Sequence, residues 1–141
     1  MILVDTNVVS ETMRQTPNPK VVAWLDAQMA ETLHLSAVSL VELLVGIAVL
    51  PDGRRKFDLG LSLERAAGFF GPRVLAFDET AAKAYAELFS RSRASGFSIG
   101  MADGQIAATA AAHGLIVATR DTAPFIAAGL TVVDPWSAHA T

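Results

Sequence analysis

The sequence predicts an α/β fold in which a mainly parallel sheet is covered by helices on both faces. Short apolar runs of strand length alternate with longer helical patterns, as in successive βαβ units. The chain has 141 residues, of which 52% are hydrophobic, so it can build one sizeable core but not two ordinary domains. No repeat, low-complexity tract or linker interrupts this order, and we expect a single domain over residues 1–141.

Five short apolar runs are the expected strands. Turn or capping residues bound each run, and the runs are too short for helices. They cover residues 2–4, 32–36, 73–77, 115–119 and 130–134. The run at 115–119 (LIVAT) is the clearest buried strand of the set.

Helical patterns fill the intervals between these runs. Asn18 precedes a first-turn proline, Asp78 is placed to cap a long helix, and Gly114 is placed to end another in the left-handed conformation. Thr6 or Asn7 is the expected cap of the first helix, and Ser39 is the expected cap of the stretch 37–50. Further helices are expected from residue 19, over 54–70, from 79 to 96, over 99–113 and over 120–128.

Composition excludes several classes of protein. There is no cysteine, so disulfides and thiolate metal sites are excluded. The apolar stretch 37–50 is too short to span a membrane, and the N-terminus has no basic region of a signal peptide, so we expect a cytoplasmic protein without membrane contact. The net charge of −3 argues against a general nucleic-acid binder, although acids that hold a cation make the formal charge look more negative than the working surface.

Two acidic residues directly follow expected strands. Asp5 follows residues 2–4, and Asp121 comes just after residues 115–119. Ligands of parallel α/β sheets bind at the carboxyl ends of the strands, so both acids fall where a site is expected. The simpler interpretation is a helix cap or first-turn acid. That interpretation is the better one for Asp121 alone and as good as the other for Asp5 alone.

Two further acids interrupt apolar helical stretches. Glu42 stands in AVSLVELLVGIAVL, where Val38 and Val45 share its helix face, and it is expected to be buried. Asp103 stands among small, uncharged residues that let a helix approach its neighbours closely, so it is expected to lie deep. The alternatives are a position of Glu42 at the rim of the core and an ordinary exposed, first-turn position of Asp103.

The four acids together predict a metal site. None has a basic neighbour in sequence apart from Arg120, which stands beside Asp121. Carboxylates brought within a few ångströms raise each other's pKa unless a cation lies between them. Oxygen ligands without cysteine or paired histidines suit Mg²⁺ or Mn²⁺ rather than Zn²⁺. A Mg²⁺ ion held by a few carboxylates is the usual arrangement where the substrate is a phosphate.

Four segments in this order carry a family resemblance: MILVDTNVVSE, SAVSLVELLVG, MADGQIAATAAAHGLIVATRD and VVDPW. The chain resembles a PIN-domain ribonuclease and, more closely, a VapC-type toxin of the FitB-like group of type II toxin–antitoxin systems. The resemblance covers nearly the whole chain. It implies a three-layer α/β/α sandwich with a central parallel sheet of about five strands.

The resemblance also implies an RNA-hydrolysing site that depends on Mg²⁺ or Mn²⁺. Its catalytic and metal-binding acids match Asp5, Glu42, Asp103 and Asp121, of which the fourth varies among relatives. Polar positions that family members place beside the metal match Thr6, Asn7 and Thr119. The metal polarises the scissile phosphate and lowers the pKa of a bound water, which becomes the nucleophile.

Partners follow from the same resemblance. An antitoxin holds such toxins inactive by laying its C-terminal segment in an apolar groove, and homodimers or dimers of heterodimers are common. RNA is expected to contact the basic run Arg54, Arg55 and Lys56, although a solvated helix face explains that run more simply. Arg120 either contacts the substrate or pairs with Asp121. The RNA target itself is not encoded in any motif.

Two other classes of function remain as alternatives. Phosphatases of the haloacid-dehalogenase type and receiver domains also place an aspartate after the first strand. The phosphatase pattern requires a second aspartate two residues later, where this chain has Asn7, and the receiver pattern requires a further aspartate and a later lysine that have no good match. A non-catalytic PIN-fold module that binds RNA or a protein partner is the second alternative, and the intact set of acids argues against it.

Overall fold

A computed structural model describes residues 1–137 of the chain. Five parallel strands form one sheet with the order β3-β2-β1-β4-β5. They are β1 (Ile2–Val4), β2 (Leu33–Ser36), β3 (Val74–Leu75), β4 (Ile116–Ala118) and β5 (Val132–Val133). Each lies inside one of the five expected runs, so the predicted parallel sheet is confirmed. β1 matches its run, and the other four strands are shorter than theirs, most of all β3 and β5.

Seven α-helices connect and cover the strands in this part of the chain. They are α1 (Thr6–Thr12), α2 (Pro19–Asp26), α3 (Ala37–Ala48), α4 (Arg54–Phe70), α5 (Glu79–Ala94), α6 (Met101–His113) and α7 (Thr122–Ala127). Two single 3₁₀ turns, η1 (Ala30–Thr32) and η2 (Gly71–Arg73), lead into β2 and β3. No helix among residues 1–137 is both long enough and apolar enough to cross a membrane.

One core lies between the sheet and helices α5, α6 and α7. Its members come from the strands β1 and β4, from those three helices, and from the residues that lead into α6 and β4. They are Leu3, Leu88, Ile99, Ile106, Ala107, Ala110, Leu115, Val117 and Phe125. Burial of each large apolar side chain contributes roughly 1.5–3 kcal/mol. This core therefore holds α6 firmly against the sheet.

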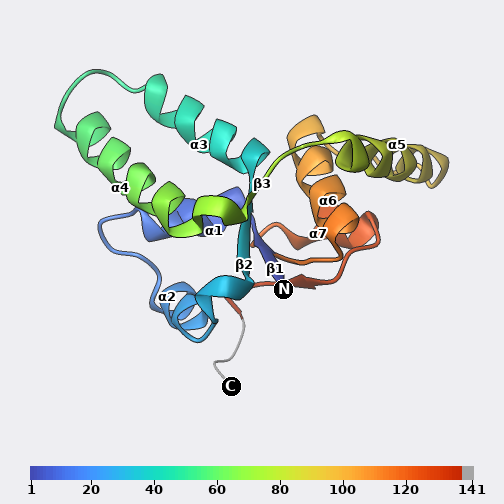
Figure 1. The fold of residues 1–141 in the computed structure, drawn as a ribbon, viewed down its shortest axis with the longest axis horizontal. Coiled ribbons are helices and arrows are strands. Elements are labelled where there is room, and N and C mark those ends of the chain that lie inside the picture. Colours follow the sequence, from blue (N-terminus) through green and yellow to red (C-terminus); the bar gives the residue numbers. More distant parts are fainter. Residues whose placement is uncertain (138–141) are drawn as a thin grey trace.

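A second core lies on the opposite face of the sheet, against helices α1 to α4. It consists of Val4, Val8, Val9, Val21, Leu33, Leu35, Leu43, Leu63 and Phe70. Successive strand residues point to opposite faces, so Leu3 enters the first core and Val4 the second. Figure 1 shows the sheet between these two groups of helices. The predicted three-layer α/β/α sandwich is confirmed.

The capping residues agree with the sequence in part. Asn18 and Asp78 accept hydrogen bonds from the first turns of α2 and α5, and Gly114 ends α6 in the left-handed conformation, all as predicted. The prediction that Thr6 or Asn7 caps α1 is wrong, because the side chain of Asp5 does so. Ser39 does not cap α3 either. The helix begins at Ala37, three residues earlier than a cap at Ser39 would place it, and the side chain of Ser36 caps it.

The helix α3 buries little of its apolar surface within this chain. Only Ser39 and Leu43 are buried among its residues, whereas most of its valines face outward. Val41, Val45 and Val49, the last just beyond the helix, are exposed by 57%, 54% and 75%. The expected burial of the face that Glu42 shares with Val45 is therefore wrong for the single chain.

Candidate active site

The strand register brings two polar residues to one edge of the sheet. Val4 at the end of β1 pairs with Ala118 at the end of β4. The backbone N–H of Asp5 donates to the carbonyl of Ala118 at 2.9 Å, so pairing continues past the strand. Because the strands are parallel, the residues that follow them, Asp5 and Thr119, lie together at the carboxyl edge.

The Asp5 carboxylate is buried, and both of its oxygens accept hydrogen bonds. The residue is only 5% exposed. Its Oδ1 accepts from the backbone N–H of Thr6 at 2.7 Å, which caps α1. Its Oδ2 accepts from the hydroxyl of Thr119 at 2.8 Å. The two interpretations of Asp5 are thus compatible, since the same side chain caps a helix and lies at the edge where ligands bind.

The fully buried hydroxyl of Thr119 joins three segments. While it donates to Asp5, it accepts from the Asn7 side-chain amide at 3.2 Å and from the backbone N–H of Asp121 at 3.1 Å. One donor and two lone pairs are the full capacity of a hydroxyl. The Asn7 Oδ1 accepts in turn from the backbone N–H of Arg120 at 3.4 Å. These bonds fix the loop between β4 and α7 against α1.

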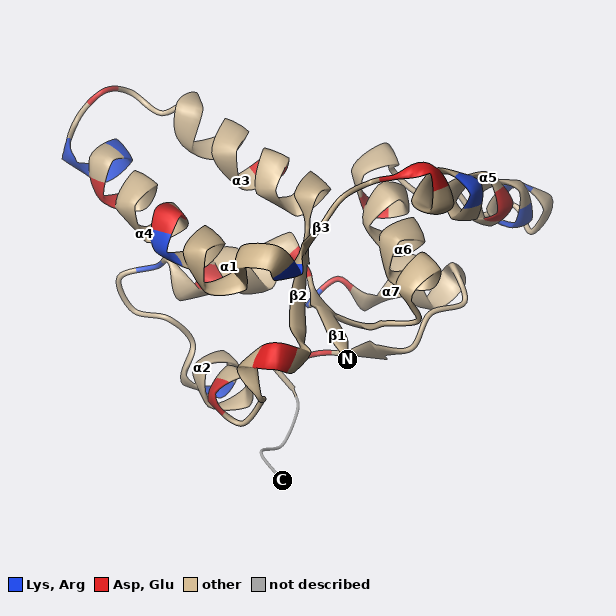
Figure 2. Cartoon of the chain, viewed as in Figure 1, with Lys and Arg blue, Asp and Glu red and all other residues tan. Residues whose placement is uncertain are grey.

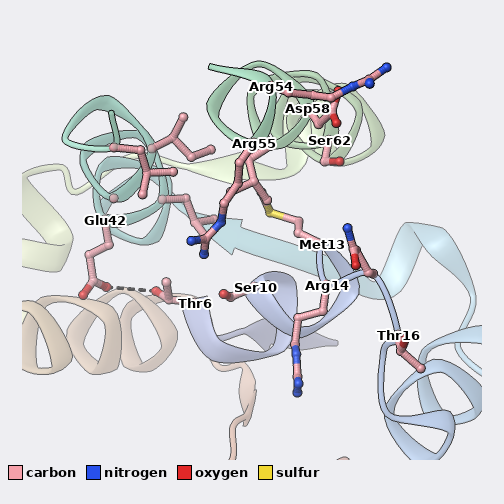
Figure 3. A pocket seen from close by; sticks show the side chains of 16 residues that line it. Thr6, Ser10, Met13, Arg14, Thr16, Glu42, Arg54, Arg55, Asp58 and Ser62 are labelled. Carbon is pink, nitrogen blue, oxygen red and sulfur yellow. Dashed lines mark hydrogen bonds between the residues drawn. The ribbon is translucent and has the colours of Figure 1, made fainter. Parts of the chain in front are cut away.

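Glu42 reaches the same edge from α3 by way of Thr6. The hydroxyl of Thr6 donates to Glu42 Oε1 at 2.9 Å, the bond drawn as a dashed line in Figure 3. The expected burial of Glu42 is wrong, because its side chain is exposed. The alternative, a position at the rim of the core, describes it better. Thr6 nevertheless ties Glu42 to the residue next to Asp5.

Asp103 and Asp121 complete the acidic edge. Asp103 lies in the first turn of α6 and is half-buried rather than deep. Asp121 is exposed and stands at the residue before α7, but its carboxylate makes no capping hydrogen bond. The interpretation of Asp121 as an ordinary helix cap therefore fails, and its carboxylate remains available to the site.

Two of the acids have raised pKa values, chiefly because they are buried and in part because other acids lie nearby. Burial raises the pKa of Asp5 above its ordinary 3.8; the hydrogen bonds from Thr119 and Thr6 lower it, and the charges of Asp103 and Glu42 raise it further. Burial also raises the pKa of Asp103, and the charges of Asp121 and Glu42 add to that rise. All four acids are thus neighbours within one electrostatic cluster.

The cluster suits a hard divalent cation by the chemistry of its donors. It offers carboxylate oxygens, with hydroxyl and amide groups behind them and neither sulfur nor imidazole, which favours Mg²⁺ or Mn²⁺. Ion pairs do not neutralise these acids, because the three salt bridges between described residues all lie elsewhere. Within residues 1–137, no three acidic or histidine side chains already stand close enough to hold one ion together.

A groove of about 1170 Å³ leads away from this edge between α1, α3 and α4. Thr6 and Glu42 line one end of it. Both Arg54 and Arg55 line the groove. Figure 3 shows the Arg55 guanidinium directed into it above Ser10, whereas the Arg54 guanidinium on the same turn points outward. Neither arginine belongs to an ion pair among the described residues.

The other basic candidates have partners of their own. Lys56 does not line the groove. Its ammonium donates to the Ala48 carbonyl at 3.1 Å and lies 3.4 Å from Asp52 Oδ1, which ties together the two ends of the α3–α4 turn. The guanidinium of Arg120 lies 5.2 Å from the centre of the Trp136 ring, as in a cation–π contact, and makes no salt bridge with Asp121.

Sequence reasoning overlooked a further arginine of the groove. Arg14 lines it and pairs with Glu11 at 3.2 Å. Glu11 is only 5% exposed and also accepts from the backbone N–H of Asn18, so it anchors the segment between α1 and α2. The spacing of Glu11 and Arg14 by three residues, across the end of α1, was the available signal.

Comparison with known proteins now identifies the fold family. The model of the PIN domain matches residues 2–129. The chain belongs to the PIN-domain family. The matched residues include all four acids of the carboxyl edge and all seven helices. The comparison thus confirms the family that the four sequence segments indicated.

Three relatives are similar along almost their whole length. Plasmid stability protein StbB of Pseudomonas syringae is 53% identical over 98% of this chain and 100% of the relative. VapC ribonuclease Y4jK of Sinorhizobium fredii is 51% identical over 96% and 98%. Toxin FitB of Neisseria gonorrhoeae is 48% identical over 96% and 99%. Identity at this level places the chain among close relatives of VapC-type and FitB proteins.

Solved structures agree with the sequence comparison. The crystal structure of FitAcB from Neisseria gonorrhoeae matches with a TM-score of 0.92 and 47% identity, over 98% of this chain and 100% of that one. The structure of FitAB bound to an IR36 DNA fragment matches with a TM-score of 0.93 and 45% identity, over 99% and 98%. The arrangement of layers and helices described above is therefore shared with these proteins.

Proposed function

We propose that this chain is a ribonuclease toxin that hydrolyses RNA phosphodiester bonds at the acidic edge of its sheet. The observation that carries the proposal is that four acids from four separate segments lie within electrostatic reach of one another, beside the groove that Glu42 lines. The chain that carries these acids is 51% identical to a VapC ribonuclease and 48% identical to Toxin FitB. The proposed catalytic and metal-binding residues are Asp5, Glu42, Asp103 and Asp121.

We propose Mg²⁺ or Mn²⁺ as the cofactor. Burial raises the pKa values of Asp5 and Asp103, and the charges of neighbouring carboxylates raise them further. A divalent cation relieves both the repulsion and the cost of burying the charge. When bound, such an ion polarises the scissile phosphate and activates a water molecule. The carboxylates that hold the ion also set where the reacting phosphate lies.

The hydrogen bonds of this chain prepare the acids for that task. Thr119 orients Asp5, and Asn7 in turn orients Thr119. Thr6 holds Glu42 Oε1, which leaves Oε2 to accept the proton of the attacking water. Hydrogen-bond donors that are already in place do not have to reorient during the reaction. Such preorganisation is the main source of electrostatic catalysis. We therefore assign supporting roles to Thr6, Asn7 and Thr119.

The groove offers a path for the RNA strand beyond the cleaved bond. Arg55 points into it and has no carboxylate partner among the described residues, so its charge is free for a phosphate. Arg54 points away and serves less directly. Lys56 and Arg120 were candidates of the same kind, but their contacts with the α3–α4 turn and with Trp136 favour structural roles.

We propose that an antitoxin restrains the activity and that the toxin works as a homodimer or a dimer of heterodimers. Support comes from the 48% identity to Toxin FitB and from the match to the FitAB structure. The exposed valines of α3 provide apolar surface of the kind that protein partners cover. We further propose that residues 1–141 act as one PIN domain in the cytoplasm, where RNA is at hand.

The test uses the purified chain freed from any partner. We expect it to cleave RNA with Mn²⁺ or Mg²⁺, to lose cleavage in EDTA, and to regain it when metal is restored. Expression without a partner should arrest growth of the host cells. If the wild type cleaves no RNA with either metal and leaves growth unchanged, the proposal is wrong, and the alternative of a non-catalytic PIN-fold module becomes the better one.

A further inference from the structure

Gly104 occupies a unique place among the ten glycines of the chain. It is buried in the first turns of α6, next to Asp103. A Cβ built on Gly104 would lie 2.8 Å from Tyr85 Cε2 and 3.6 Å from Ile99 Cγ2, whereas a Cβ on any other glycine meets nothing within 4 Å. Contacts under 3.0 Å essentially never occur, so position 104 has no room for a side chain unless Tyr85 moves.

Glycine inside a helix is less favourable than alanine, because it loses more backbone freedom on folding. The helix α6 is otherwise rich in alanine, and Gly104 is its only glycine. Its backbone needs no special conformation, since no positive φ occurs there. The close approach of Tyr85 is the remaining physical reason for glycine at this place.

The ring of Tyr85 has two aromatic neighbours. Phe77 meets it edge-on at 6.3 Å and Phe89 stacks on it at 6.1 Å between ring centroids. Aromatic pairs at these separations favour such geometries. Phe77 lies between β3 and α5, and the other two rings belong to α5. Of these rings, that of Tyr85 is the one that carries the close contact of α5 with α6 at Gly104.

We propose that the contact between Tyr85 and Gly104 is a positioning device for the Asp103 carboxylate. The Cα atoms of residues 103 and 104 are joined by a rigid peptide about 3.8 Å long, so a shift at one is carried to the other. The Tyr85 ring rests on the helix at Gly104, one residue from the acid. Tyr85 and Gly104 are thus positioning residues, and this inference rests on the proposed function of Asp103 in metal binding.

Three variants and one control test this device: Gly104→Ala, Tyr85→Leu, the double variant, and Gly68→Ala. Gly68 is an exposed helical glycine of α4 with nothing within 4 Å of its missing Cβ. Calorimetric titration of the metal-free proteins gives the Mn²⁺ affinity, and amide resonances of the same metal-free samples report the position of the first turn of α6. Cleavage assays with RNA separate kcat from KM.

We expect Gly104→Ala to weaken Mn²⁺ binding and lower kcat by about tenfold or more with little change in KM, because misplacement on the order of 1 Å has effects of this size. Its amide shifts should concentrate at residues 101–105. The double variant should bind Mn²⁺ more tightly than Gly104→Ala alone, since the smaller leucine side chain that replaces Tyr85 makes room for the new methyl group and the two effects are not additive. Gly68→Ala should behave as wild type.

Wild-type Mn²⁺ affinity and unshifted α6 amides in Gly104→Ala would overturn the inference, as would a double variant that shows the plain sum of the two single losses. If Gly104→Ala does not fold, Tyr85→Phe and Tyr85→Leu decide. Tyr85→Phe keeps the ring and should bind Mn²⁺ as tightly as the wild type does, whereas Tyr85→Leu should bind it more weakly. Equal Mn²⁺ affinities of these two variants would contradict the inference. If the wild type neither binds Mn²⁺ nor cleaves RNA, the proposed function is wrong. The amide shifts of the variants then still test whether the contact between Tyr85 and Gly104 positions the first turn of α6.

Discussion

The two helices that carry Glu42 and Asp103 reverse the usual relation between hydrophobicity and burial. The helix α3 is the more apolar of the two, yet most of its valines are exposed. The helix α6 is rich in alanine, and six of its residues between Gly104 and Ala110 are buried. Figure 2 shows the same contrast in position, since α6 packs beside α5 and α7 while much of α3 extends away from the sheet.

The difference teaches that small side chains bury a helix more completely than large apolar ones. Alanine and glycine let α6 approach the sheet and α5 closely, so its backbone lies inside the first core. Among the described residues, Leu43 of α3 is buried in the second core, whereas Val41, Leu44 and Val45 are exposed, and apolar surface of this kind is what protein partners cover. One acid is therefore held rigidly from behind, and the other is held mainly through Thr6.

The largest expected effect concerns the acids themselves. Asp103→Asn and Glu42→Gln should each lower RNA cleavage by at least about a hundredfold, as loss of an electrostatic group in an active site does. Both variants should keep the circular dichroism spectrum of the wild type. Steady-state kinetics with purified protein measure the loss. Activity within about tenfold of wild type for either variant would remove that acid from the site.

The next prediction compares how much a truncation in each of the two helices lowers the free energy of unfolding. Ile106→Ala in α6 removes a side chain that is 0% exposed and should reduce the free energy of unfolding by roughly 2–5 kcal/mol. Val45→Ala in α3, where the side chain is 54% exposed, should change it by less than about 0.5 kcal/mol in the monomer. Urea titration of dilute protein gives both values. A large cost at Val45 under those conditions would mean that α3 is covered by its own chain after all.

A smaller effect is expected in the groove beside α3. Arg55→Gln should raise KM for RNA by about fivefold to tenfold with little change in kcat, and the effect should shrink as salt is raised. Arg54→Gln, on the same helical turn but pointing away in Figure 3, is the matched control and should change KM by less than about twofold. Equal effects of the two substitutions would argue against a directed phosphate contact at Arg55.

The smallest effect is a shift in thermal stability with pH. The pKa of Asp103 is raised by burial, so its contribution to stability is complete below 3.8 and is lost as pH rises through the folded-state value. In EDTA, Asp103→Asn should therefore melt higher than wild type at neutral pH, and the difference should vanish below 3.8. Melting curves at several pH values measure it. A variant that melts lower at neutral pH would contradict the assigned cause.

The sequence was informative where local patterns decide the structure. Five apolar runs located the strands, and the resemblance of four segments identified the family. It misjudged the cap of α1, because a side chain such as Asp5 can serve a helix and a site at once. It also misjudged the burial of Glu42, because hydropathy does not distinguish surface covered within the chain from surface covered by another molecule.

Other features depend on contacts between distant residues, which a single sequence does not display. The stacking of Arg120 on Trp136 and the approach of Tyr85 to Gly104 join separate elements. The direction of Arg55 into the groove, with Arg54 beside it pointing outward, depends on where α4 packs against α1 and α3. Periodicity predicts that such residues share a helix but not which neighbour each of them meets.

The hydrogen bond between Asp5 and Thr119 spans 114 positions of the chain. Strand β1 lies between β2 and β4, so the sheet cannot close around Asp5 until β4 has been made. During translation, Asp5 is therefore present long before Thr119 and Asp121 are added. The hydroxyl of Thr119 and the backbone N–H of Asp121 complete the hydrogen bonds around Asp5 only after the first four strands have been made.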